Sequence, residues 1–116
     1  GSLAGKEVYA NGTVYCASKH AVDAITEGMR KDLHGYKIKV GAVHPGLVET
    51  NFSAVRFKGD LDKASTVYKG YDALQASDIA EVIAFVVTRP PHVNVADLLV
   101  LPSAQASSTL VDKTDA

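Results

Sequence analysis

The sequence lacks most of the features that would direct it to a disulfide scaffold or a metal site. It contains no tryptophan, one methionine and one cysteine in 116 residues. A single cysteine excludes an internal disulfide framework and fits a reducing compartment, so we expect a cytoplasmic protein. The four histidines are scattered and have no metal-ligand spacing, so we predict no metal site.

Two further classes are excluded by the charge and hydropathy patterns. The chain carries 12 basic and 13 acidic residues, interspersed, for a formal net charge of −1. This balance provides no basic footprint for nucleic acid. No apolar stretch reaches membrane-spanning length, and the chain does not open with a signal-peptide pattern. We therefore expect at most one globular domain, with neither nucleic acid nor membrane as a partner.

The clearest chemical signal is the pair formed by Tyr15 and Lys19. The two residues are four positions apart in a stretch that reads as a helix, so they share a helix face. A fixed positive charge beside a phenol stabilises the phenolate, which suits a general acid/base acting on an alcohol or a carbonyl. The spacing alone favours a surface helix that carries a half-buried tyrosine and a solvated lysine, and the neighbouring elements change that balance.

Two more elements accompany this pair in a fixed order. Ser2 precedes Tyr15 by thirteen residues, within Gly1-Ser2-Leu3-Ala4-Gly5. Downstream, an apolar run ends in a second pattern, Pro45-Gly46-Leu47-Val48-Glu49-Thr50. The patterns S-x-A-G, Y-x-x-x-K and P-G-x-V-x-T together resemble the short-chain dehydrogenase/reductase family. The resemblance covers the chain from its first residues to Thr50.

The resemblance implies hydride transfer between a nicotinamide cofactor and a substrate carbon. Tyr15 would be the catalytic acid/base and would contact both substrate and cofactor. Lys19 would bind the nicotinamide ribose and stabilise the phenolate. Ser2 would hold the substrate oxygen, although satisfying the backbone of a turn is the commoner role of serine.

The Pro-Gly pattern would form the other side of the cofactor site. Pro45 and Gly46 would bring the backbone close to the nicotinamide ring, because glycine has no side chain to obstruct it. By resemblance, the Val48 backbone and the Thr50 hydroxyl would bind the carboxamide. An ordinary strand-ending turn would explain Pro-Gly alone. We interpret His44, just before this turn, as structural.

Two later stretches narrow the resemblance. Residues 52–60 and 89–102 look like segments of the branch that acts on serine, allo-threonine and other 3-hydroxy acids. Members of that branch usually use NADP, so we expect NADP, with NAD as the alternative. Arg56 could clamp a substrate carboxylate, or it could be a solvated loop charge. The other open functions are a carbonyl reductase of a different substrate class and a non-catalytic oligomerisation module.

Periodicity and turn signals predict the order of elements. They indicate an active-site helix over about 14–33, a strand over 37–43, a substrate flap over 50–72, a helix over 78–88 capped by Ser77, and a last strand over 97–101. Residues 103–116 are small and polar, and we expect a mobile tail or an arm that docks on a partner subunit.

These elements predict the α/β class, and the resemblance implies the C-terminal portion of a doubly wound parallel-sheet (Rossmann) fold. The glycine-rich phosphate loop of such folds, G-x-x-x-G-x-G, does not occur in the chain. We therefore interpret the sequence as part of a longer enzyme that lacks the N-terminal phosphate-binding half and is inactive alone. The resemblance also implies a homo-oligomer, either a dimer or a tetramer.

Overall fold

The computed structural model describes residues 1–50 and 66–114. Most of the predicted flap, with Arg56, lies outside these ranges. The described elements follow in the order η1 (Leu3–Gly5), α1 (Thr13–Leu33), η2 (His34–Tyr36), β1 (Ala42–Pro45), α4 (Ala76–Val87) and β2 (Asp97–Val100).

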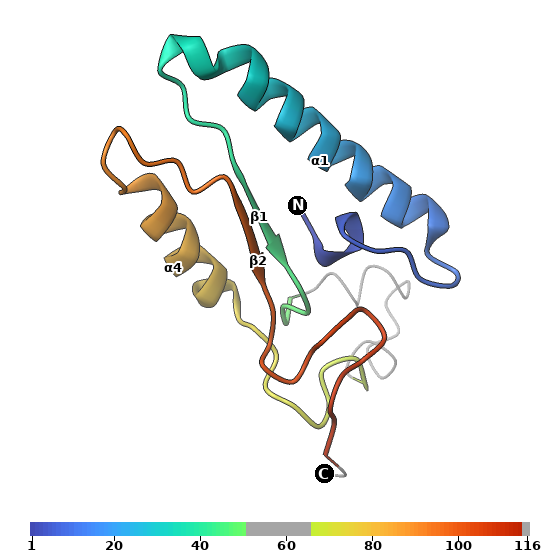
Figure 1. Cartoon of the computed structure of the whole chain (residues 1–116). Coiled ribbons are helices and arrows are strands. Elements are labelled where there is room, and N and C mark those ends of the chain that lie inside the picture. The colour runs from blue at the N-terminus through green and yellow to red at the C-terminus, as the bar shows by residue number, and fades with distance from the viewer. Residues whose placement is uncertain (51–65, 115–116) are drawn as a thin grey trace.

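The two strands pair in parallel between helices. Ala42 lies opposite Asp97, and Pro45 lies opposite Val100. Parallel neighbours need a crossover connection, and the chain makes it through α4. Figure 1 shows α1 on one side of the strand pair and α4 on the other. This arrangement is the α/β architecture predicted from the sequence.

The segment before α1 packs beneath that helix. Leu3 and Ala4 of η1 are 6% and 4% exposed, and Cys16 in the first turn of α1 is fully buried. These small and apolar side chains allow η1 to lie close to the first turns of α1. As a result, Ser2 is held beside the N-terminal half of the helix that carries Tyr15.

The first strand lies later than predicted. The sequence indicates a strand over 37–43, but β1 begins at Ala42. Lys37 has a left-handed backbone (φ 58°) that closes η2, and the ladder with β2 begins only at Ala42, opposite Asp97. A strand is defined by its hydrogen-bonded neighbour, and β2 is only four residues long. The last strand is correspondingly one residue shorter than the predicted range 97–101.

The helix after the flap begins earlier than predicted. Ser77 is not its N-cap, because α4 begins at Ala76 with Gln75 as the capping residue. The Asp78 carboxylate accepts a hydrogen bond of 2.7 Å from the Gln75 backbone N–H. A carboxylate three residues into a helix satisfies the capping amide in this way and moves the start of the helix towards the N-terminus.

The segment after β2 is folded back, in contrast to the expected mobile tail, and the alternative of an arm that docks on a partner subunit stays a prediction. Gln105 and Val111 form an antiparallel bridge, and the Asp112 N–H donates to the Ala104 carbonyl at 2.9 Å. Further along, the Thr114 N–H donates to the Gly70 carbonyl at 2.8 Å. Small polar residues form this structure because backbone groups of the same chain satisfy one another.

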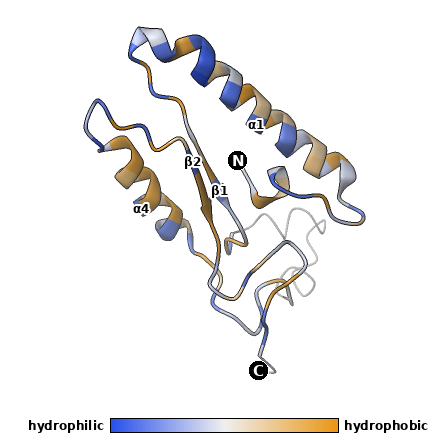
Figure 2. Ribbon diagram, in the orientation of Figure 1, coloured by the Kyte–Doolittle hydropathy of each residue, from blue (hydrophilic) through white to orange (hydrophobic). Residues whose placement is uncertain are grey.

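Several large apolar side chains remain exposed on the helices. Figure 2 shows that α4 is mostly hydrophobic, and Ile83, Phe85 and Val87 in it are 46%, 50% and 72% exposed. On α1, Ile25 is 61% exposed. Among the described residues, no helix combines the length and the apolarity needed to cross a membrane.

The cap at Gln75 gives a first prediction. Asp78→Ala should lower the free energy of unfolding of the whole protein by about 1 kcal/mol, because the Gln75 N–H loses its acceptor. Asp78→Asn keeps an oxygen and should retain most of that stability. Urea unfolding measures both, with Glu81→Ala on the same helix as a control expected within about 0.5 kcal/mol of the unchanged protein. Equal stability of the Asp78→Ala and Glu81→Ala variants would contradict the cap.

Candidate active site

A cavity of about 450 Å³ opens where β1 ends. Its walls come from the N-terminal segment, α1, the turn after β1 and the segment after β2. It contains every sequence-predicted site residue that the structure describes, namely Ser2, Tyr15, Lys19, Pro45, Gly46, Val48 and Thr50. Arg56 lies outside the described residues. A cleft beyond the carboxyl end of a parallel strand is the usual ligand position in this class of fold.

Tyr15 and Lys19 contribute to the cleft from the same face of α1. Both are half-buried, and the Lys19 Nζ lies 5.6 Å from the centroid of the Tyr15 ring. The helical spacing of four residues produces this proximity. Within residues 1–50 and 66–114, the Lys19 ammonium makes no ion pair or hydrogen bond. A positive charge is therefore held beside the phenol and is available to a ligand.

Ser2 has a structural partner as well as a place in the cleft. Its Oγ accepts a hydrogen bond of 3.1 Å from the Ala4 N–H and so caps η1. This is the turn role that the sequence analysis left open. Accepting one hydrogen bond leaves the hydroxyl proton free to be donated. The hydrogen bond with Ala4 therefore positions the Ser2 hydroxyl while leaving its proton available for a hydrogen bond to an oxygen atom of a ligand.

The turn after β1 is held by backbone hydrogen bonds on both sides. The Gly46 N–H donates to the Val100 carbonyl at 2.8 Å, and the Leu74 N–H donates to the Leu47 carbonyl at 3.1 Å. The Tyr68 hydroxyl donates to the Val48 carbonyl at 3.0 Å. The Val48 N–H donates to no group in the part of the chain that the structure describes. A fixed turn thus carries, at the edge of the cleft, a donor that none of the described residues occupies.

Sequence reasoning missed several residues that shape the cleft. Tyr68 and Ser108 line it, and the buried Gln105 accepts a hydrogen bond from the Leu47 N–H. Ser108 and Gln105 belong to the segment that was expected to be mobile. No periodicity or motif marks these positions, because their partners lie far away along the chain.

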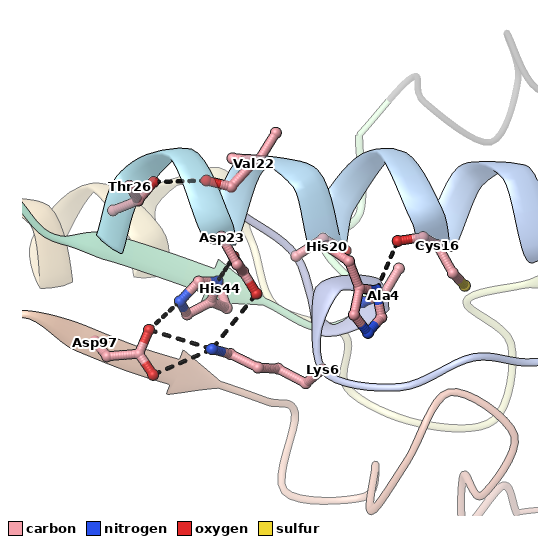
Figure 3. Close-up of polar contacts among 10 residues, drawn as sticks. Ala4, Lys6, Cys16, His20, Val22, Asp23, Thr26, His44 and Asp97 are labelled. Carbon is pink, nitrogen blue, oxygen red and sulfur yellow. Dashed lines mark hydrogen bonds and ion pairs between the residues drawn. The ribbon is translucent and has the colours of Figure 1, made fainter. Parts of the chain in front are cut away.

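A polar cluster behind the cleft joins α1 to both strands. Figure 3 shows the His44 ring between Asp23 and Asp97, with Lys6 bridging the two carboxylates. His44 is 1% exposed, and its Nε2 is hydrogen-bonded to Asp97 Oδ1. Its Nδ1 lies 3.5 Å from Asp23 Oδ1. The Lys6 Nζ lies 3.5 Å from Asp23 Oδ2 and 3.2 Å from Asp97 Oδ2. His44 therefore acts as a structural residue, as the sequence analysis proposed.

The cluster shifts two pKa values. The hydrogen bond from His44 is the largest effect and lowers the pKa of the Asp97 carboxyl; burial opposes this shift, and Lys6 adds to the lowering. For Lys6, burial by itself would lower the pKa, but the hydrogen bond with Asp97 and the charge of Asp23 raise it overall. Each shift favours the charged form of its group. In the described ranges, no group of three or more His, Cys, Asp or Glu residues could hold a metal ion.

The parallel strand pair between helices, with its cleft at the carboxyl end of β1, defines a doubly wound α/β protein. The family model described as short chain dehydrogenase matches residues 1–61, which is more than half of the 116 residues. The chain belongs to the short chain dehydrogenase family.

Two curated relatives show how much of such a protein the chain represents. It is 47% identical over 116 residues to the NADP-dependent 3-hydroxy acid dehydrogenase of Schizosaccharomyces pombe, and it covers 45% of that protein. It is 43% identical over 114 residues to sulfoacetaldehyde reductase 2 of Chromohalobacter salexigens, covering 97% of this chain and 45% of the relative. The chain thus spans less than half the length of these relatives.

A solved structure agrees with the fold over nearly the whole chain. It is the closed form of a serine dehydrogenase complexed with NADP+, and it superposes with a TM-score of 0.90 at 42% sequence identity. The match covers 98% of this chain and 46% of that one.

The polar cluster gives a prediction about pH. Asp97 has a lowered pKa in the folded protein, so its contribution to stability is present above the unfolded pKa of about 3.9 and is lost as the pH falls through the folded value. Asp97→Asn removes this contribution but keeps an oxygen for His44. The difference in unfolding free energy between the unchanged protein and Asp97→Asn should be constant from pH 7 to about pH 5 and should shrink below about pH 4.

Urea titrations across this pH range measure that difference. Asp112→Asn is the matched control, because Asp112 is exposed and its side chain makes no ion pair among the described residues. A difference between the unchanged protein and Asp97→Asn that grows as the pH falls would contradict the role given to Asp97.

Proposed function

We propose that the whole protein is an NADP(H)-dependent oxidoreductase that transfers hydride between the cofactor and a 3-hydroxy acid such as serine or allo-threonine. The proposal rests on one observation: Ser2, Tyr15 and Lys19 line the same cleft as the turn after β1. The relative from Schizosaccharomyces pombe is named an NADP-dependent 3-hydroxy acid dehydrogenase, and the solved structure is a serine dehydrogenase complexed with NADP+. Both names support the proposed cofactor and substrate class.

Tyr15 is the proposed acid/base. In the oxidising direction its phenolate takes the proton of the substrate hydroxyl, and in the reducing direction its hydroxyl returns a proton to the carbonyl oxygen. The Lys19 ammonium near the ring stabilises the phenolate. Ser2, fixed by its cap to Ala4, donates its hydroxyl proton to the substrate oxygen and holds that oxygen beside the phenol.

The residues around the turn fit a nicotinamide cofactor. Among the described residues, the Lys19 ammonium has no hydrogen-bond or ion-pair partner, which suits a ribose hydroxyl, and the Val48 backbone N–H has no acceptor, which suits a carboxamide oxygen. We assign the second carboxamide contact to the Thr50 hydroxyl, and Pro45 and Gly46 form the wall against the ring. When bound, the cofactor supplies the hydride acceptor or donor.

The rest of the cofactor site is proposed to lie outside this chain. The chain contains no G-x-x-x-G-x-G pattern for the phosphates. We therefore propose that residues 1–116 alone neither bind NADPH tightly nor turn over substrate. NAD remains the alternative cofactor. We also propose a cytoplasmic homo-oligomer, and exposed apolar residues such as Ile25 on α1 and Phe85 on α4 support an association surface.

A carbonyl reductase of another substrate class is the second candidate function. It is favoured by the relative from Chromohalobacter salexigens, which has a similar identity but is named a sulfoacetaldehyde reductase. The remaining alternative is a non-catalytic module for oligomerisation, which the exposed apolar side chains of α1 and α4 support. Activity measurements on the whole protein separate these candidates.

Replacing the phenol tests the proposed chemistry. In the whole protein, Tyr15→Phe should lower kcat about a thousandfold, because the proton transfer loses its acid/base. The dissociation constant for NADPH should change less than about threefold, since packing against the cofactor is retained. Stopped-flow turnover and fluorescence titration measure the two quantities. The control is Tyr36→Phe at an exposed tyrosine, and a Tyr15→Phe variant with normal turnover would remove the dehydrogenase proposal.

Replacing the arginine tests the proposed substrate class. Arg56→Ala should raise KM for a 3-hydroxy acid by about tenfold or more while leaving KM for a neutral alcohol unchanged, because only the acid needs a cationic partner. Arg56→Lys keeps the charge but loses the bidentate fork, and it should fall between the two. An unchanged preference between acid and alcohol in Arg56→Ala would show that this arginine does not clamp the substrate.

A further inference from the structure

We infer that Gln105 is a positioning residue that sets the turn between β1 and Val48, and through that turn the affinity of the protein for NADP(H). The inference rests on the proposed function. Gln105 lies in the segment after β2, about sixty positions along the chain from the turn that it contacts.

The Gln105 side-chain amide is buried, and both its oxygen and its nitrogen make hydrogen bonds. Its side chain is 6% exposed. The Oε1 accepts a hydrogen bond of 2.9 Å from the Leu47 N–H, and the Nε2 donates one of 3.2 Å to the Ser107 carbonyl. A backbone N–H can only donate and a carbonyl can only accept, so these two partners determine which end of the amide faces the turn.

Gly46 makes room for this amide. A Cβ built on Gly46 would lie 2.3 Å from Gln105 Oε1 and 2.8 Å from Leu101 Cδ2. Both distances are too short for carbon contacts, so any larger residue would displace the glutamine or the turn. One reason for a glycine at position 46, inferred from the sequence, is a close approach of the backbone to the nicotinamide ring. The structure supplies a second reason within the protein itself.

The segment that carries Gln105 is anchored at several points. The Gln105 N–H donates to the Pro102 carbonyl at 2.9 Å, and the bridge between Gln105 and Val111 closes the loop. Ser108, which lines the cleft, donates its N–H to the Glu7 carboxylate of the N-terminal segment. The glutamine therefore contacts the turn from a segment that is itself held in place by hydrogen bonds.

Gln105 makes a hydrogen bond that the backbone around the turn does not replace. Pro45 has no N–H to donate, and the Gly46 N–H is already bonded to Val100. Among the described residues, the Leu47 N–H has Gln105 as its only acceptor. The next N–H along the chain belongs to Val48, the proposed donor to the cofactor. Loss of the Gln105 acceptor would loosen the backbone directly before that donor.

Substitutions of Gln105 in the whole protein test the inference. Gln105→Leu removes the acceptor at similar volume, and Gln105→Glu keeps an acceptor for the Leu47 N–H but loses the donor to Ser107. Thr109→Ala is the matched control, since it alters an exposed side chain of the same segment. For each variant, the dissociation constant for NADPH is measured by fluorescence titration, kcat and KM by steady-state kinetics, and thermal stability by circular dichroism.

For Gln105→Leu we expect NADPH binding about tenfold weaker, as expected for a loosened backbone donor, with kcat at saturating NADPH reduced less than about threefold. Gln105→Glu should bind NADPH within about threefold of the unchanged protein, and Thr109→Ala should match it. Gln105→Glu also covers the case in which Gln105→Leu does not fold, because tenfold weaker binding by a folded glutamate variant would overturn the inference.

The failure of this inference is distinguishable from failure of the proposed function. If the unchanged protein binds NADPH and Gln105→Leu binds it equally well, the positioning role is overturned and the oxidoreductase remains. The same conclusion follows if Gln105→Leu is less thermostable but binds NADPH normally, which is the result of a purely structural role. If the unchanged whole protein neither binds NADPH nor turns over substrate, the proposed function and this inference fall together.

Discussion

The parallel pairing of β1 with β2 is the constraint on which the rest of the described structure depends. Four residue pairs connect the strands, from Ala42 with Asp97 to Pro45 with Val100. Because both strands run in the same direction, the segments that follow them leave at the same edge of the sheet. The turn after β1 and the segment after β2 are therefore neighbours, and the cleft forms where the first helix meets them.

The polar cluster determines how that helix is attached to the strands. His44 of β1 contacts Asp23 of α1 and Asp97 of β2, and Lys6 joins the same two carboxylates. Burying a histidine ring is unfavourable unless its nitrogen atoms find partners. Asp97 provides a hydrogen bond to Nε2, whereas Nδ1 lies 3.5 Å from Asp23 Oδ1 and has no hydrogen-bond partner among the described residues. Together with Lys6, the two carboxylates hold the helix that carries Tyr15 against the strand that ends at Pro45. A structural histidine thus links the two halves of the proposed site.

Local signals in the sequence accounted for the elements and failed mainly at their limits. The recurrence of small and apolar residues at three- and four-residue steps indicated the long helix, and α1 spans nearly the predicted range. The predicted strand over 37–43 began too early because its partner strand begins only opposite Ala42. The Ser77 cap was wrong because the Asp78 carboxylate reaches back to Gln75. Both errors arise from a competing partner that a local pattern does not contain.

Periodicity in the sequence by itself determined the α/β class, and the motifs determined the family resemblance and the candidate residues from Ser2 to Thr50. They could do so because the i, i+4 relation of Tyr15 and Lys19 and the order of the motifs are properties of the chain alone. Only the tertiary structure decided that the segment after β2 folds back and that Gln105 meets the Leu47 N–H. The physical reason is that such a contact joins residues far apart in sequence, and it forms only after the strand pair has brought their backbones together.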